Sequence, residues 1–185
     1  MYKLCKTEKS ASRQRELEQG LLKAMCRQRF DEISISDLCD GLNIPRKSFY
    51  RYFSSKEGAL FALVDHTIME FYDDESTPMF RGGTPMEDMK KFFRFWYERR
   101  NFIAALERSQ LTGIMVQRAV MLAEKEYLMP GYQKKWSSQV QKMAISFAVC
   151  GMMSLLLEWH KDNYRSTPEE IAKLAVGLLS NPLLL

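Results

Sequence analysis

The chain has 185 residues, of which 46% are apolar, 12% are aromatic and 27% are charged. This composition is that of an ordinary globular protein of one or two domains, and it excludes a disordered or fibrous chain. Nine glycines and six prolines are too few for a low-complexity protein, and their scarcity favours helices.

The cysteines and histidines do not form a metal-binding pattern. Four cysteines occur singly, without a CxxC pair, and two histidines could join them: Cys5, Cys26, Cys39, Cys150, His66 and His160. Zinc-ligand spacing is therefore absent, and we predict no metal or other cofactor. The N-terminus also lacks the apolar core of a signal peptide, so we expect a cytoplasmic protein with reduced thiols.

The excess of positive charge lies towards the N-terminus. Residues 1–60 contain 12 Lys and Arg against eight Asp and Glu, whereas residues 61–185 contain 15 of each. A basic end on a neutral body suits an anionic polymer such as nucleic acid, although a solvated surface would show the same imbalance.

Two helices are expected at the start of the chain. Apolar residues at helical spacing predict the first over residues 12–27. Ser34, with Asp37 three residues later, has the spacing of a capping box and predicts a second, short helix that ends near Gly41.

A turn and two further helices follow. Asn43 tolerates the left-handed conformation that reverses the chain, and Pro45 fits the first turn of a third helix over residues 45–52. Ser54 and Glu57 repeat the capping-box spacing and predict the start of a fourth helix, which apolar residues continue as far as Phe71.

Residues 73–85 contain prolines and glycines without a helical pattern, and we place the boundary between two units there. Beyond it, the last helix has the clearest start, with Thr167 as N-cap, Pro168 at the first position and Glu170 in the capping-box place. The helices expected after the boundary cover residues 85–99, 101–110, 113–129, 133–161 and 168–179.

Residues 143–157 form an uncharged run that falls short of the roughly 18–20 residues that span a bilayer. We therefore expect no membrane contact. Apolar residues surround the helix axis, so a second chain is expected to cover part of it, in a homodimer built on a four-helix bundle. The alternative is the central core helix of a monomer. The predicted interface consists of Ala144, Phe147, Ala148, Gly151, Leu155, Leu174 and Leu178.

Two short helices joined by a four-residue turn match a helix-turn-helix, whose second helix enters the DNA major groove. No acid occurs from Gly41 to Lys56. Arg46 and Lys47 project from the first turn, where they can donate hydrogen bonds to guanine, whereas Phe49 and Phe53 are expected inside the domain. The residues predicted to contact DNA are Ser34, Arg46, Lys47, Ser48, Tyr50, Tyr52 and Lys56.

The run SISDLCDGLNIPRKSFYRYFSSKEGALFALV, preceded by a helix that leads to Phe30, resembles the DNA-binding domain of the TetR family of bacterial transcriptional regulators. The resemblance covers about residues 12–64 and is most specific in FYRYF followed by SKE. It implies a homodimeric, all-helical regulator, usually a repressor, whose C-terminal domain can bind a small inducer. It places Arg46 and Lys47 towards the bases and the other five predicted residues at the DNA backbone.

The run departs from the usual family residues at Arg29, Asn43, Pro45 and Lys47. The first three affect caps and turns. Lys47 adds a long cation to the DNA-facing side, which could shift the sequence preference or raise nonspecific binding.

We predict an all-α protein, with a three-helix DNA-binding domain at residues 1–55 and a helical effector-binding and dimerisation domain at residues 56–185. Its predicted function is a repressor that binds a double-stranded DNA operator and is released by a small apolar or amphipathic effector. The alternative is a DNA-binding adaptor that recruits a protein and senses no small molecule. No enzyme motif is present, so no enzymatic activity is expected. An effector pocket is predicted at Phe92, Trp96, Phe102, Met115 and Met121, although such a stripe is more often core.

Overall fold

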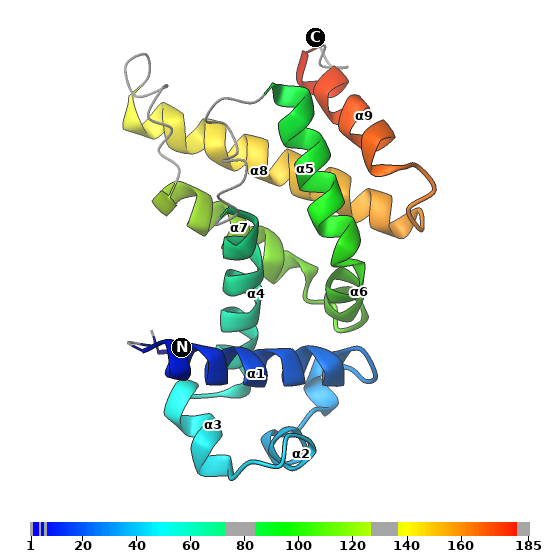
Figure 1. Cartoon of the computed structure of the whole chain (residues 1–185). Coiled ribbons are helices and arrows are strands. Elements are labelled where there is room, and N and C mark those ends of the chain that lie inside the picture. Colours follow the sequence, from blue (N-terminus) through cyan, green and yellow to red (C-terminus); the bar gives the residue numbers. More distant parts are fainter. Residues whose placement is uncertain (1, 4, 6, 73–83, 127–136, 181–185) are drawn as a thin grey trace. The chain divides into compact units, whose positions relative to one another are not determined.

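The computed structural model describes residues 2–3, 5, 7–72, 84–126 and 137–180, with the side chains of residues 125 and 126 left out, and the regular elements within these ranges are helices (Figure 1). An isolated antiparallel bridge joins Tyr2 and Phe53. The predicted all-α fold class is confirmed. The elements are α1 (Glu8–Met25), the 3-10 turn η1 (Phe30–Glu32), α2 (Ile35–Gly41), α3 (Arg46–Tyr52), α4 (Lys56–Tyr72), α5 (Pro85–Glu98), α6 (Arg100–Arg108), α7 (Thr112–Glu126), α8 (Ser138–Lys161) and α9 (Pro168–Ser180).

The chain divides into two compact units. The first consists of Met1–Thr67 and Ala104–Arg118, and the second of Ile68–Ile103 and Ala119–Leu185. The boundaries between them fall inside α4, α6 and α7. The functional division between residues 55 and 56 stays a prediction, and most of the predicted boundary segment, residues 73–83, lies outside the described residues.

Local caps explain where the helices of the first unit begin. α1 starts earlier than the pattern of apolar residues predicts, because the Thr7 hydroxyl accepts a hydrogen bond from the Ser10 backbone N–H. Ser34 caps α2 as predicted. Pro45 precedes α3 rather than occupying its first turn. In the first turn of α4 the Gly58 N–H donates to the Ser55 hydroxyl at 3.2 Å, one residue after the predicted Ser54.

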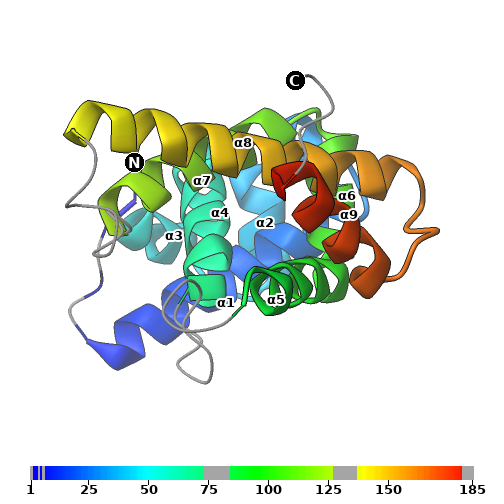
Figure 2. The ribbon, with the colours of Figure 1, turned by 90° about the horizontal axis from the view of Figure 1, so that it is seen from above.

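The second unit packs α9 against both α5 and α8 (Figure 2). Thr84 and Glu87 form a capping box at the start of α5, and Thr167 and Glu170 form the predicted one at the start of α9. The predicted positions 127–129 and 133–136 of the neighbouring helices lie outside the described residues. The core of this unit is aromatic, with Phe92, Phe93, Trp96 and Trp159 all buried.

One side of α8 carries apolar side chains that are exposed among the described residues of its unit. Met143 and Phe147 are exposed, and 78% of the Phe147 surface is accessible. By length and composition alone α8 could cross a membrane, but core helices of soluble proteins pass the same test. Of its most apolar stretch, 17% is buried. The described part of the second unit therefore leaves an apolar surface exposed on α8.

Candidate nucleic-acid interface

α2 and α3 form the predicted helix-turn-helix in the first unit. At the start of α2 the Ser34 hydroxyl accepts from the Asp37 N–H at 3.0 Å and donates to the Asp37 carboxylate at 2.6 Å. In the turn, Asn43 has a φ of 52°, and the Ile44 N–H donates to the Cys39 carbonyl at 2.9 Å. Asn tolerates this left-handed conformation better than most residues, as the sequence predicts.

The side of α3 that faces the unit is aromatic and buried. Phe49 and Phe53 are fully buried, with their ring centroids 5.2 Å apart, which confirms the predicted structural role of this pair. Tyr52 joins them and is 6% exposed. A seven-residue helix is too short to be stable alone, so these buried rings hold α3 in place.

The opposite side of α3 is cationic and exposed. Arg46, Lys47 and Tyr50 all lie in solvent, Ser48 is half-buried, and α3 contains no acid. Ser34 is also exposed, at the start of α2. Five of the seven residues predicted to contact DNA are therefore accessible, at least in part, on α3 and at the start of α2.

Lys56 is the first residue of α4, and its side chain has three backbone partners within the first unit. Its ammonium group donates to the backbone carbonyls of Phe30 and Ile33, both at 2.6 Å, and of Asp31 at 3.3 Å. It also lies 4.5 Å from the centroid of the Phe30 ring. An ammonium group has three N–H donors, so these carbonyls use all of them. Lys56 thus ties the start of α4 to the segment before α2, and its predicted phosphate contact stays a prediction.

A groove of about 520 Å³ lies between the start of α1 and the end of α3. Three cations line it, Lys9, Arg13 and Arg51, together with Glu16, which is ion-paired to Arg13. Sequence analysis did not single out Lys9 and Arg13 as site residues. The excess of positive charge in residues 1–60 was the available signal, but it does not show which cations come together.

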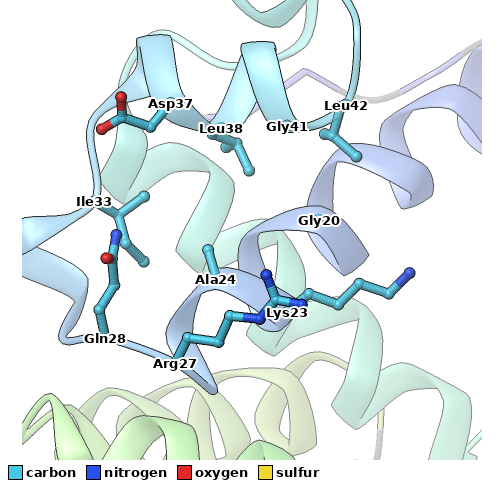
Figure 3. A pocket seen from close by; sticks show the side chains of 10 residues that line it. All are labelled: Gly20, Lys23, Ala24, Arg27, Gln28, Ile33, Asp37, Leu38, Gly41 and Leu42. Atoms are coloured by element: carbon cyan, nitrogen blue, oxygen red, sulfur yellow. The ribbon is translucent and has the colours of Figure 1, made fainter.

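A second groove, of about 320 Å³, lies between α1 and α2 (Figure 3). Lys23 extends from α1 and Arg27 from the turn that follows it on one side, and Asp37 lies on α2 on the other. The helices approach closely at Gly20, where an added Cβ would lie 2.6 Å from a methyl group of Leu42. Gly20 therefore allows α1 and the end of α2 to pack together.

The residues predicted for an effector pocket are divided between the two units. In the second unit, Phe92, Trp96 and Phe102 are buried, and the Trp96 ring lies 6.3 Å from that of Phe92 and 6.2 Å from that of Phe102. The Trp96 indole N–H is buried and has no hydrogen-bond partner among the described residues. Met115 is buried in the first unit, and Met121, in the second, is 39% exposed.

The residues predicted for the dimer interface lie on α8 and α9. Phe147, Gly151 and Leu174 are exposed, and the other four are half-buried. A shallow apolar groove of about 240 Å³ runs between the two helices. Its lining includes five of the seven predicted residues, namely Phe147, Ala148, Gly151, Leu155 and Leu178.

Replacement of Lys56 by Met should destabilise the first unit. The variant keeps an unbranched side chain but leaves the Ile33 carbonyl without its Lys56 donor and the Phe30 carbonyl with the Ile33 N–H in place of two donors, so we expect the free energy of unfolding to fall by about 1–3 kcal/mol. The control is Lys47→Met, an exposed position where the change should stay within about 0.5 kcal/mol. Urea unfolding at fixed protein concentration measures both, and equal values would contradict the structural role of Lys56.

Comparison with known proteins adds one similarity in sequence and several in structure. No protein-family model matches the chain. Over 40 residues it is 50% identical to the HTH-type transcriptional regulator EthR of Mycolicibacterium smegmatis. That match covers 22% of this chain and 18% of the relative, so it concerns less than a fifth of the length of EthR.

Two solved structures resemble nearly the whole chain. The fatty acid degradation regulator FadR from Bacillus halodurans matches with a TM-score of 0.63 and 14% identity, over 93% of this chain and 96% of that one. A TetR-family transcriptional regulator from Streptomyces coelicolor matches with a TM-score of 0.54 and 19% identity, over 90% of this chain and 78% of that one. The chain therefore has the all-helical fold of the TetR-family transcriptional regulators, whose DNA-binding domain its residues 12–64 resemble in sequence.

Proposed function

We propose that the protein is a sequence-specific DNA-binding transcriptional regulator that acts as a repressor in the cytoplasm. The observation that carries this proposal is the two-sided character of α3. Its inner side is fixed by Phe49 and Phe53, whereas its outer side presents Arg46, Lys47 and Tyr50 without an acid. A short, rigid, cationic helix after a tight turn suits the major groove of duplex DNA. The protein acts by binding, not by catalysis.

The two cations at the start of α3 are proposed to read bases. Arg46 can donate two hydrogen bonds to the O6 and N7 atoms of guanine, and Lys47 can donate to the same acceptors. Ser48 and Tyr50 have hydroxyl groups that can donate to phosphate oxygens beside the groove. Ser34 is proposed to join them when its hydroxyl turns from the Asp37 carboxylate, to which it donates in the free protein. Tyr52 and Lys56 complete the proposed phosphate contacts, although each is tied into the first unit and would reach DNA from the edge of this surface.

The protein is further proposed to act as a homodimer. An apolar groove lies between α8 and α9, and the Phe147 ring beside it is exposed. Removing this apolar surface from water would be favourable, so it is a candidate interface. A second copy supplies the same surface, so the four helices would form a closed bundle around a two-fold axis. Such a dimer would present two α3 helices to a pseudo-palindromic operator.

An effector with an apolar body and a hydrogen-bond acceptor is proposed to release the DNA. Trp96 supports this class of molecule, because its buried indole N–H has no partner in the described part of the chain and an unpaired buried donor costs about 1–3 kcal/mol. Phe92 and Phe102 supply apolar surface beside it. The second candidate is an adaptor without an effector, which the mutual burial of these three rings favours.

Selection of bound duplexes from a random DNA pool tests the DNA-binding function. The purified protein should enrich one pseudo-palindromic motif at physiological ionic strength. Arg46→Ala should weaken binding to that motif by about 1–3 kcal/mol and relax the preference at one base position in each half-site. The same motif with unchanged affinity would exclude Arg46 from base recognition, and no enriched motif at all would refute the function.

A charge at Gly151 should separate the proposed dimer. Gly151 is exposed on α8, and a Cβ there meets no atom within 4 Å in the single chain, so Gly151→Glu should not disturb the fold of the subunit. We expect a monomer by analytical ultracentrifugation, with weak operator binding, because the bundle would bury an unpaired charge.

The matched control is Gly113→Glu. Gly113 is an exposed helical glycine in the first unit, with equally open space around its Cβ. This variant should stay dimeric. If both variants dimerise as the natural chain does, the interface lies elsewhere.

A library of small apolar and amphipathic molecules, applied to the protein–operator complex, tests the effector. We expect compounds that release the DNA and that need about two- to tenfold higher concentrations with Trp96→Phe, since that variant lacks one hydrogen-bond donor. Tyr164→Phe, which loses a hydroxyl group elsewhere in the second unit, should respond as the natural chain does. A protein that binds its operator but is released by no compound would favour the adaptor.

A further inference from the structure

The segment Tyr2–Lys3 is paired with the end of α3. The Lys3 N–H donates to the carbonyl of Tyr52 at 3.0 Å, and Tyr2 forms the antiparallel bridge with Phe53. Tyr52 is the last residue of α3, and Phe53 is its C-cap, with extended backbone angles of φ −127° and ψ 137°. The segment thus adds two strand-like contacts where the helix stops.

The contact with Lys3 provides a hydrogen bond to a carbonyl group at the C-terminal end of α3. The last four carbonyls of an α-helix have no partner inside the helix, and the Lys3 N–H satisfies one of them. α3 has seven residues, so a large part of it consists of end residues that can fray. A restraint at Tyr52 and Phe53 therefore limits how far the recognition surface can move.

The Tyr2 side chain anchors the same segment to α4. Its hydroxyl donates to the Asp65 carboxylate at 2.7 Å, and its ring meets the His66 ring edge-on at a centroid distance of 5.6 Å. Burial first, and then the hydrogen bond to Asp65, raise the pKa of the Tyr2 phenol, so it stays protonated and remains a donor at neutral pH.

Asp65 also joins α4 to α7. This carboxylate is 1% exposed, and Arg118 of α7 donates to both of its oxygens, through Nε at 2.5 Å and through a terminal nitrogen. The hydrogen bond to Asp65 is the main cause that raises the pKa of Arg118. A buried carboxylate is costly unless it is paired, so Tyr2 and Arg118 together stabilise the charged form of Asp65.

We propose that Tyr2–Lys3 is a positioning segment for the recognition helix, with Asp65 as its anchor and Arg118 as the link to α7. The proposal rests on the proposed DNA-binding function. All the residues involved belong to the first unit, in which Arg118 is the last residue, and α7 continues beyond it to Glu126. A displacement of Arg118 would change the pairing of Asp65 and, through Tyr2, the restraint on the end of α3.

Tyr2→Phe tests the segment because it removes only the hydroxyl group. In the free protein, hydrogen exchange of the α3 amides should be faster by about two- to tenfold, the effect of one hydrogen bond, with α1 and α4 unchanged. Operator affinity should fall by a similar factor, while the dependence of affinity on salt should not change, because no cation is lost.

The matched control is Tyr164→Phe, which removes a tyrosine hydroxyl that lies 2.9 Å from His160 Nδ1 in the second unit. It should leave both the exchange of α3 and the affinity unchanged. The proposal is overturned if Tyr2→Phe behaves as this control does. It is also overturned if exchange accelerates equally in α1, α3 and α4, since that result would show a general loss of stability.

The link to α7 is tested by combining Tyr2→Phe with Arg118→Gln. Both changes act on Asp65, so their effects on α3 exchange should not be additive. Additive effects would remove Arg118 from the proposal. Hydrogen exchange needs no DNA, so these results decide the role of the segment even if the natural chain fails to select any duplex, which would refute the proposed function alone.

Discussion

The arrangement of the first unit depends on the burial of one side of a seven-residue helix. Forming an isolated helix of this length in water is unfavourable, because its nucleation cost is spread over too few hydrogen bonds. Phe49 and Phe53 supply the missing stability, since both rings are removed from water and contact each other. The polar side chains of α3 are then free to face solvent at fixed positions, which is the condition for reading a DNA groove.

Electrostatics in the same unit separate into buried and exposed groups. The buried carboxylates Glu18 and Asp65 are paired, with His66 and Arg118 respectively, so their charges serve the fold. Lys56 is likewise committed to backbone carbonyls. By contrast, Arg46 and Lys47 of α3 lie in solvent, and Arg13 in the groove beside α1 is paired only at the surface, with Glu16. Because the buried charges are paired and the exposed cations are separate from them, a positive surface is compatible with a stable interior.

The second unit differs from the first because it exposes apolar side chains on α8 to solvent. The aromatic core around Trp96 and Trp159 is closed, whereas Phe147 on α8 is left in water. A single subunit can bury only part of the surface of a helix that has apolar residues all around its axis. Dimerisation through α8 and α9 would remove this surface from solvent and would also set the distance between two recognition helices, so one interaction would serve both stability and recognition.

The sequence by itself determined the all-helical class, the starts of α2 and α9, the left-handed turn at Asn43 and the buried side of α3. These features depend on spacing and capping between residues close in the chain, which hydrophobic periodicity reports directly. Tertiary structure alone decided that Lys56 would meet carbonyls more than 20 residues away, that Met115 and Met121 would fall in different units, and that Tyr2 would reach Asp65. Such pairings depend on how the helices pack, and local patterns contain no information about partners so distant in the chain.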